Sequence, residues 1–256
     1  MPRFSANLGF LWPDLSLPEA IRAAHAAGFD AVECHWPFET AIEQVQAALA
    51  DTGLKMLGLN TRLGDISAGD NGLAAQPGRE PEARAAIDEA IAYAAQIDCA
   101  AVHVMAGFGR SAEHRAAFLD NLSYACARAR PHNITILIEP LNRHDAPDYF
   151  LHTTDQAAAI IREVAADNLA LMFDCYHVGR SEGDVITRAR ALQNQIGHIQ
   201  FAGVPARGTP DQGELNYTEI FAALDGMGWH RPLGAEYKPG AARTQDTLGW
   251  MKTLAG

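Results

Sequence analysis

Four polar residues follow short apolar runs in the second half of this 256-residue chain. Glu139 ends ILIE and Asp174 ends LMFD, whereas Gln200 lies in HIQF. Glu236 follows GA, and the separations of 35, 26 and 36 residues each correspond to about one strand plus one helix. Carboxylate and carboxamide oxygens suit a hard or borderline divalent cation, so the pattern predicts one Mg²⁺ or Mn²⁺ bound by these four residues.

Three carboxylates placed together repel one another, and their pKa values rise unless a cation lies between them. A single acidic residue at a strand end is usually a cap or a salt bridge at the rim. Four such residues on consecutive strands favour a metal site instead.

The four cysteines contain no C-x-x-C pair, which argues against a zinc or redox framework and predicts reduced, partly buried thiols.

Eight short apolar runs alternate with Ala-rich segments of helical spacing along the chain. The runs cover residues 4–8, 31–34, 55–59, 101–105, 135–139, 170–174, 197–201 and 233–237. Eight strands that alternate with eight helices predict a single α/β domain over residues 1–256, a closed (β/α)8 TIM barrel rather than an open doubly wound sheet. The strand ends of such a barrel converge on one mouth, which would bring the four polar residues together.

Helix boundaries support this alternation. Ser16 precedes a helical segment with Pro18 and Glu19 in its first turn and Gly28 at its end. Further N-caps are expected at Thr153 or Thr154, at Asn216 and at Thr244. The longest non-periodic stretch, residues 61–81, follows the third strand and is interpreted as either a lid over the mouth or an ordinary surface loop.

The composition limits the kinds of molecule that this protein is expected to bind. With 48% hydrophobic and 20% charged residues, the chain resembles a soluble globular protein. Its net charge of −11 argues against nucleic-acid binding. The sequence contains no uninterrupted stretch of about 18 apolar residues, so no membrane-spanning helix is expected. The N-terminus lacks the pattern of a signal peptide, which predicts a cytoplasmic protein. Ala-rich helices are compatible with a homo-oligomer, whose size the sequence does not give.

An anionic substrate of this negatively charged chain needs a positive anchor. The candidates at the mouth are Arg207, Lys238 and His177, although the first two can equally be solvated loop charges and the histidine can satisfy a backbone group. Asn7 and Asn60, at the ends of the first and third strands, are weaker substrate-binding candidates. Other polar residues in or after strands, interpreted as either site or core groups, are Glu33, His35, His103 and His198.

Several segments resemble the hydroxypyruvate isomerase family, which belongs to the xylose-isomerase-like barrel superfamily. They are FSANLGFLW, LHTTDQA, FDCYH, GHIQFAGVP, QGELNY and GAEYKP, and they extend from the first strand to Lys238. The resemblance implies a metal bound by Glu139, Asp174, Gln200 and Glu236. It also implies that Glu139 and Glu236 are the proton acceptor and donor pair that interconverts hydroxypyruvate and tartronate semialdehyde through an enediolate. Ketol isomerisation independently requires a carboxylate base and a Lewis acid.

The loop after Arg207 departs from the family pattern, because Gly208 and Thr209 stand where many members carry His and an acidic residue. This departure leaves 2-dehydrotetronate, a four-carbon sugar acid, as an alternative substrate. A ketose 3-epimerase on the same scaffold is a second alternative, but such enzymes usually offer a histidine in place of Gln200. The negative charge argues against an abasic-site endonuclease, and the complete acidic set argues against a non-catalytic binding protein.

Overall fold

Nine short parallel strands form one sheet in this computed structural model, which describes residues 2–254. Met1, Ala255 and Gly256 of the predicted domain lie outside the described residues. The strands are β1 Phe4–Asn7, β2 Ala31–Glu33, β3 Lys55–Met56, β4 Leu59–Asn60, β5 Ala101–His103, β6 Thr135–Ile138, β7 Leu169–Asp174, β8 Ile196–Phe201 and β9 Leu233–Ala235. Their order in the sheet is β3-β2-β1-β9-β8-β7-β6-β5-β4.

The sheet closes into a barrel because β3 and β4 are two parts of one segment. The third strand, predicted as a single run over 55–59, is interrupted at Leu57 and Gly58. Its first part pairs with β2 and its second part with β5, so this segment joins the two ends of the sheet. The (β/α)8 barrel prediction is therefore confirmed, with the third strand divided between its two neighbours.

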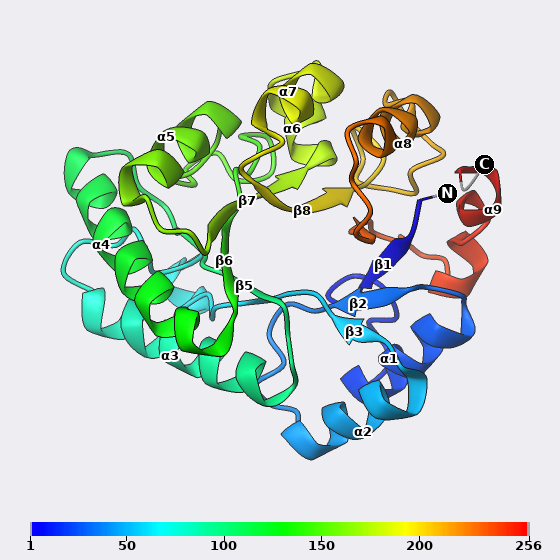
Figure 1. Cartoon of the computed structure of the whole chain (residues 1–256), viewed down its shortest axis with the longest axis horizontal. Coiled ribbons are helices and arrows are strands. Elements are labelled where there is room, and N and C mark those ends of the chain that lie inside the picture. The colour runs from blue at the N-terminus through cyan, green and yellow to red at the C-terminus, as the bar shows by residue number, and fades with distance from the viewer. Residues whose placement is uncertain (1, 255–256) are drawn as a thin grey trace.

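Helices surround the barrel on the outside (Figure 1). They are α1 Leu17–Ala26, α2 Ile42–Thr52, α3 Glu80–Gln96, α4 Ala112–Ala129, α5 Thr154–Val164, α6 Cys175–Ser181, α7 Val185–Leu192, α8 Tyr217–Gly226 and α9 Trp250–Leu254, with 3-10 helices η1 Ile66–Ala68, η2 Arg130–His132 and η3 Thr244–Thr247. Two helices, α6 and α7, occupy the connection between β7 and β8, where the sequence predicts one. Across residues 2–254, none of the helices is both long and apolar enough to span a bilayer.

Three of the predicted helix starts are confirmed. Glu19 accepts a hydrogen bond from the Ser16 backbone at 3.0 Å, and Thr153 and Asn216 cap α5 and α8. The predicted cap at Thr244 is wrong. Its buried hydroxyl accepts from the Trp12 backbone N–H at 2.7 Å, which leaves a short η3 and a separate α9 in place of one helix.

The long loop over residues 61–81 is partly fixed to the barrel. The Ala74 and Ala75 backbone N–H groups donate to the carbonyls of Met105 and Ala106 at 3.2 and 2.7 Å. In contrast, Ile66 at the tip of the loop is 68% exposed. The part of the loop around η1 therefore extends into solvent, whereas the part around Ala74 and Ala75 packs on the barrel.

Aromatic rings fill the space between strands β1 and β8 and helices α8 and α9. Phe4 from β1 packs against Phe201 from β8 and Trp250 from α9, with ring centroids 5.8 and 5.0 Å apart. Trp250 is fully buried, so the last helix packs on the outside of the barrel next to the first strand (Figure 1). These contacts hold β1 and β8, two strands that carry polar residues at the barrel mouth, against the outer helices.

All four cysteines are buried and free, as the sequence predicts. Burial raises the pKa of Cys99 and of Cys126 to about 12, and it raises the pKa of Cys34 and Cys175 well above the usual range. We expect Ellman's reagent to label none of the four thiols in the native protein at pH 8, and all four in guanidinium. Rapid labelling of the native protein would contradict this packing.

Candidate functional site

The four predicted metal ligands lie at one end of the barrel, at or just beyond the ends of neighbouring strands. Asp174 and Gln200 are register partners on β7 and β8. Glu139 and Glu236 each directly follow the last residue of a strand, β6 and β9, so the predicted strand ends are one or two residues too long. All four residues are between 2% and 5% exposed. Such burial of charged groups requires compensation by partners or by an ion.

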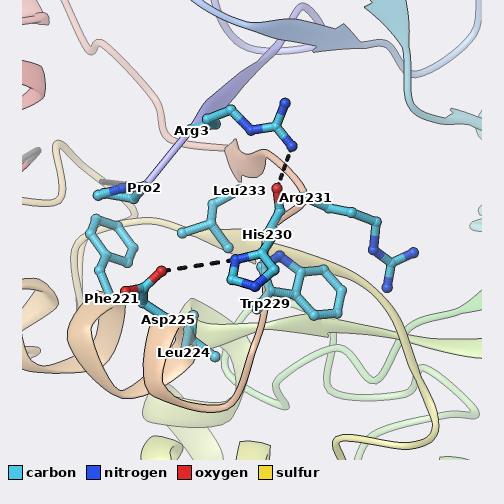
Figure 2. Close-up of a pocket in the computed structure, with 9 residues that line it drawn as sticks. All are labelled: Pro2, Arg3, Phe221, Leu224, Asp225, Trp229, His230, Arg231 and Leu233. Atoms are coloured by element: carbon cyan, nitrogen blue, oxygen red, sulfur yellow. Dashed lines mark hydrogen bonds and ion pairs between the residues drawn. The ribbon is translucent and has the colours of Figure 1, made fainter.

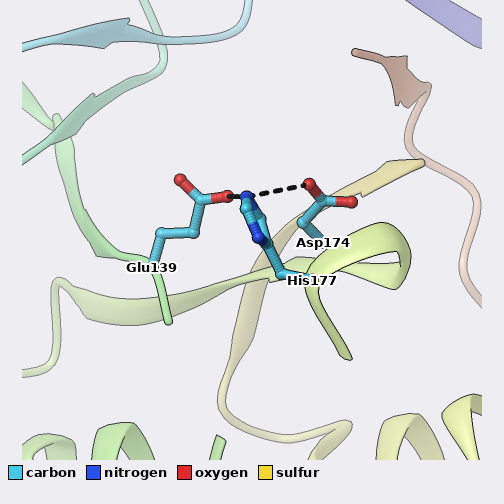
Figure 3. Close-up of side chains that lie close together, drawn as sticks. All are labelled: Glu139, Asp174 and His177. Atoms are coloured by element: carbon cyan, nitrogen blue, oxygen red, sulfur yellow. Dashed lines mark ion pairs between the residues drawn. The ribbon is translucent and has the colours of Figure 1, made fainter. Parts of the chain in front are cut away.

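Glu139, Asp174 and His177 form a compact cluster (Figure 3). The His177 Nε2 atom lies 3.7 Å from Glu139 Oε1 and 3.6 Å from Asp174 Oδ2. One atom of each residue lies within 4.8 Å of the others, which is close enough for the three groups to share an ion. His177 lies in the first turn of α6, whose N-cap is Asp174 itself.

The hydrogen bonding of His177 favours a role as hydrogen-bond donor rather than as metal ligand. Its Nδ1 accepts from the Asn142 backbone N–H at 3.0 Å, and the Asn142 amide Nδ2 lies 2.7 Å from the same atom. Burial, and then the Arg207 charge, lower the pKa of His177 to about 3, so the ring is neutral. A neutral ring that accepts at Nδ1 carries its hydrogen on Nε2 and can donate to an oxygen, but it cannot ligate a metal there.

Buried oxygens without partners test whether a divalent ion fits. Among residues 2–254, Glu139 Oε1, Asp174 Oδ2 and Gln200 Oε1 are buried and have no hydrogen-bond donor. Unsatisfied buried oxygens are costly, and each of these belongs to a different predicted ligand. A hard cation between them would satisfy all three, so the donor set fits a Mg²⁺ or Mn²⁺ ion.

Glu236, the fourth predicted ligand, is fully occupied by protein donors. Its Oε1 accepts from Asn7 Nδ2 at 2.9 Å and lies 3.2 Å from His35 Nε2. Its Oε2 accepts from Arg207, whose guanidinium also lies 3.7 Å from Asp174 Oδ2. The arginine therefore supplies the positive charge nearest to these two carboxylates.

Arg207 is held by aromatic faces as well as by charge. Its guanidinium carbon lies 4.9 and 5.0 Å from the ring centroids of Phe10 and Tyr176. The residue has a positive φ of 53°, which turns its side chain from the loop after β8 into the mouth. The carboxylates around the guanidinium outweigh its burial and raise its pKa above the ordinary value, so it is a permanent cation of the site.

Burial and the neighbouring charges give the three carboxyl groups of the site different pKa values. Burial, together with the charges of Glu236 and Asp174, raises the pKa of Glu139 well above its usual range. Burial also raises the pKa of Asp174 to about 7, although Arg207 opposes this. At Glu236 the Arg207 charge and the His35 hydrogen bond outweigh burial, and the pKa falls to about 2. A divalent cation would favour the ionised form of all three.

The predicted substrate-binding residues differ in position. Asn7, His177 and Arg207 converge on the carboxylates, as described above. Lys238 is exposed, its backbone N–H donates to the Arg207 carbonyl at 2.8 Å, and its Nζ lies 5.6 Å from the Phe10 ring centroid. Asn60 is half-buried at the end of β4, where its backbone N–H donates to the His35 carbonyl at 2.8 Å.

His35 and Glu33, which the sequence left open as either site or core groups, contact predicted ligands of the site. His35 contacts Glu236 directly, and Glu33 contacts Gln200 at 2.9 Å. The available signal was their place on or after the second strand, which would bring them to the same mouth. His103 lies 3.7 Å from Glu139, and burial lowers its pKa to about 4, so it is a neutral neighbour of that carboxylate.

A separate cavity of about 310 Å³ lies at the opposite end of the strands. Arg3 and Leu233, at the starts of β1 and β9, line it together with Trp229 and His230 (Figure 2). Arg3 donates there to the His230 carbonyl. This end of a barrel usually serves stability, whereas chemistry occurs where the strands end.

Comparison with known proteins shows the family of this chain. A family model described as xylose isomerase-like TIM barrel matches residues 21–254. The chain belongs to this family. It is 44% identical to a 2-oxo-tetronate isomerase of Cupriavidus necator, with all of both chains covered. It is also 36% identical to the hydroxypyruvate isomerase of Escherichia coli, with 98% of each chain covered. These full-length matches confirm the resemblance to the hydroxypyruvate isomerase family and identify the chain as an isomerase.

Solved structures share the barrel. A crystal structure from Brucella melitensis, described as an AP endonuclease of family 2, has a TM-score of 0.94 at 34% identity, with 99% of both chains covered. A D-psicose 3-epimerase has a TM-score of 0.82 at 17% identity, with all of both chains covered, and this likeness concerns the fold alone. The family thus includes members named for different reactions, so the reaction has to be argued from the residues of the site.

Proposed function

We propose that this protein is a divalent-metal-dependent isomerase of a short 2-oxo-3-hydroxy acid. The observation that carries the proposal is the set of unpartnered, buried oxygens on Glu139, Asp174 and Gln200, next to a second glutamate, Glu236. A bound divalent ion supplies a Lewis acid for the negative charge that develops on two adjacent substrate oxygens during ketol isomerisation. The remaining chemistry is a proton transfer between two carbons, for which the chain offers two carboxyl groups.

The two glutamates exchange this proton with the substrate. One glutamate removes the proton from C3, the carbon that carries the hydroxyl group, and the other delivers a proton to C2, the former carbonyl carbon. The hydroxyl hydrogen moves from the C3 oxygen to the C2 oxygen, so no other reactant is consumed. His177 Nε2–H, which points between Glu139 and Asp174, donates to the substrate oxygen that gains charge (Figure 3).

Hydroxypyruvate, whose product is tartronate semialdehyde, is the first candidate substrate. Arg207 is the candidate partner for its carboxylate, since a guanidinium binds carboxylates in a bidentate manner. If Glu236 also held the divalent ion, the ion would share the charge of this carboxylate and would leave the guanidinium available to the substrate. Lys238, next to the Phe10 ring, adds a second positive charge at the entrance.

The four-carbon acid 2-oxo-tetronate, or 2-dehydrotetronate, is the second candidate. It is hydroxypyruvate extended by one CH₂OH group at C3, so the same proton transfer applies. The 44% identity to a 2-oxo-tetronate isomerase favours it, and so do the small residues Gly208 and Thr209 after Arg207. These residues leave space on the loop where many relatives carry larger ones.

The acidic surroundings argue against an endonuclease. The chain has a net charge of −11, and the barrel mouth gathers the carboxylates of Asp174, Glu236 and Glu139 around one half-buried arginine. A nucleic-acid backbone requires basic groups to neutralise its phosphates. A 2-oxo acid carries one carboxylate, for which one arginine is sufficient.

Proton exchange in D₂O tests the proposal most directly. We expect the protein with Mg²⁺ to replace the C3 hydrogens of its substrate by deuterium and to form the isomer, as followed by ¹H NMR. Hydroxypyruvate, 2-oxo-tetronate and D-fructose are compared in parallel. Fructose tests the ketose epimerase alternative.

The controls are the EDTA-treated protein and the same samples with Mg²⁺ but without protein. Exchange that is lost in EDTA and restored by Mg²⁺ supports metal dependence, and the faster acid identifies the substrate. Exchange that persists at full rate in EDTA would disprove the metal-dependent mechanism. A lack of exchange with every acid would disprove the proposed substrate class.

A further inference from the structure

We propose that Glu33 is a positioning residue that holds the side-chain amide of Gln200 with its oxygen directed toward the metal site. The proposal rests on the proposed metal-dependent function. Glu33 ends β2, and its side chain is buried in the barrel interior. It contacts two residues of β8 rather than a neighbour on its own strand.

The first contact determines the orientation of the amide. Gln200 Nε2 donates to Glu33 Oε2 at 2.9 Å, whereas Gln200 Oε1 is buried without a partner. Nitrogen and oxygen lie on opposite sides of a planar carboxamide, so holding the nitrogen also directs the oxygen. The reversed amide would place its oxygen against a carboxylate oxygen and lose the hydrogen bond. Glu33 thus selects the orientation that presents an oxygen ligand.

The second contact holds the carboxylate itself. His198 lies two residues before Gln200 on β8, so both side chains point into the barrel. Its Nε2 lies 2.9 Å from the same Glu33 Oε2 that accepts from Gln200. One carboxylate oxygen thus connects two side chains of β8 and is fixed from two directions.

Gly234 on β9 provides the space for this connection. In the sheet, β1 and β9 separate β2 from β8, so Glu33 has to reach across them. A Cβ atom at position 234 would lie 2.1 Å from Glu33 Oε1 and 2.8 Å from Gln200 Cγ. The lack of a side chain at this position is therefore required for Glu33 to reach Gln200.

The expected effect of Glu33 is on metal affinity. Groups that orient metal ligands typically contribute about 10- to 100-fold to affinity. We expect Glu33→Gln to weaken Mn²⁺ binding by about this factor in isothermal titration calorimetry, because a carboxamide at position 33 no longer selects one orientation of Gln200. The exposed Glu163→Gln variant, which makes the same substitution at a glutamate that pairs with Arg115, is the matched control and should bind like the wild type.

A double variant separates orientation from packing. In E33Q/Q200E the amide and the carboxylate exchange places, so the new amide at position 33 donates to a carboxylate at position 200. A carboxylate presents an oxygen in either orientation and needs no selection by its neighbour. We therefore expect the double variant to regain Mn²⁺ affinity relative to Glu33→Gln, although both variants alter the same buried pair. Circular dichroism and thermal unfolding of the metal-free proteins test their folding.

The outcomes distinguish this inference from the proposed function. If the wild type does not bind Mn²⁺, the metal-dependent function is wrong. If the wild type binds and Glu33→Gln binds equally well, the function stands and the role of Glu33 is wrong. Weak binding by both Glu33→Gln and the double variant would also overturn the orientation role, since it would indicate that the buried pair serves packing alone.

Discussion

Replacing Glu236 by Gln is expected to lower the isomerisation rate by about 10²- to 10⁴-fold, the usual contribution of a general acid or base. The carboxylate is fixed by Asn7, His35 and Arg207, so its orientation in the site is determined before any substrate enters. The amide of Gln keeps the shape but cannot accept a proton from carbon. Steady-state rates and deuterium incorporation into the substrate, each at saturating Mg²⁺, measure the loss.

Glu139→Gln provides the second half of this test. If one glutamate removes the proton and the other returns it, both variants should lose isomerisation to a similar extent. Glu163→Gln, whose side chain is exposed and pairs with Arg115, should retain the wild-type rate. Proton exchange at the wild-type rate in Glu236→Gln would show that the paired-glutamate mechanism is wrong.

The barrel could be predicted because strand and helix periods alternate clearly along the chain. The eight apolar runs correspond to the observed strands within one or two residues at each end. The interrupted third strand could not be foreseen, because its two parts differ only in which neighbour they pair with. The cap at Thr244 failed for a similar reason, since its hydroxyl is used by Trp12, 232 residues away in the sequence.

The sequence predicted which strand ends carry the candidate site residues, but it did not predict the contacts between their side chains. The separations of Glu139, Asp174, Gln200 and Glu236 by one β/α unit imply a shared mouth, and the structure places all four at the same end of the barrel. The partners of these residues depend on side-chain directions across the barrel, which no local pattern encodes. For this reason the tautomer of His177, which depends on Asn142, emerges only in the structure.

Metal binding is expected to stabilise the protein, and to do so more strongly as the pH rises. At a Mn²⁺ concentration 100-fold above Kd, mass action contributes about 2.7 kcal/mol. For a chain of this size this corresponds to a rise in Tm of about 5 to 10 °C. Differential scanning fluorimetry with and without Mn²⁺ measures the shift, and the same scans in EDTA at each pH provide the reference for unfolding of the metal-free protein.

The sign of the pH dependence follows from the raised pKa values of two proposed ligands. In the metal-free protein burial raises the pKa of Asp174 to about 7 and that of Glu139 well above its usual range, so at pH 5.5 both groups hold protons that a cation must displace. Stability from a raised carboxyl pKa is present at low pH and is lost as the pH rises through the folded-state value, near 7 for Asp174. The cation replaces that lost stability at high pH.

For Asp174 alone, the affinity for Mn²⁺ should increase on the order of 30-fold between pH 5.5 and pH 8, at about tenfold per pH unit below its pKa. His177, whose pKa is about 3, remains neutral throughout this range and does not alter the sign. A Mn²⁺-induced rise in Tm that is equal at pH 5.5 and pH 8 would mean that the ion binds elsewhere than between these buried carboxyl groups.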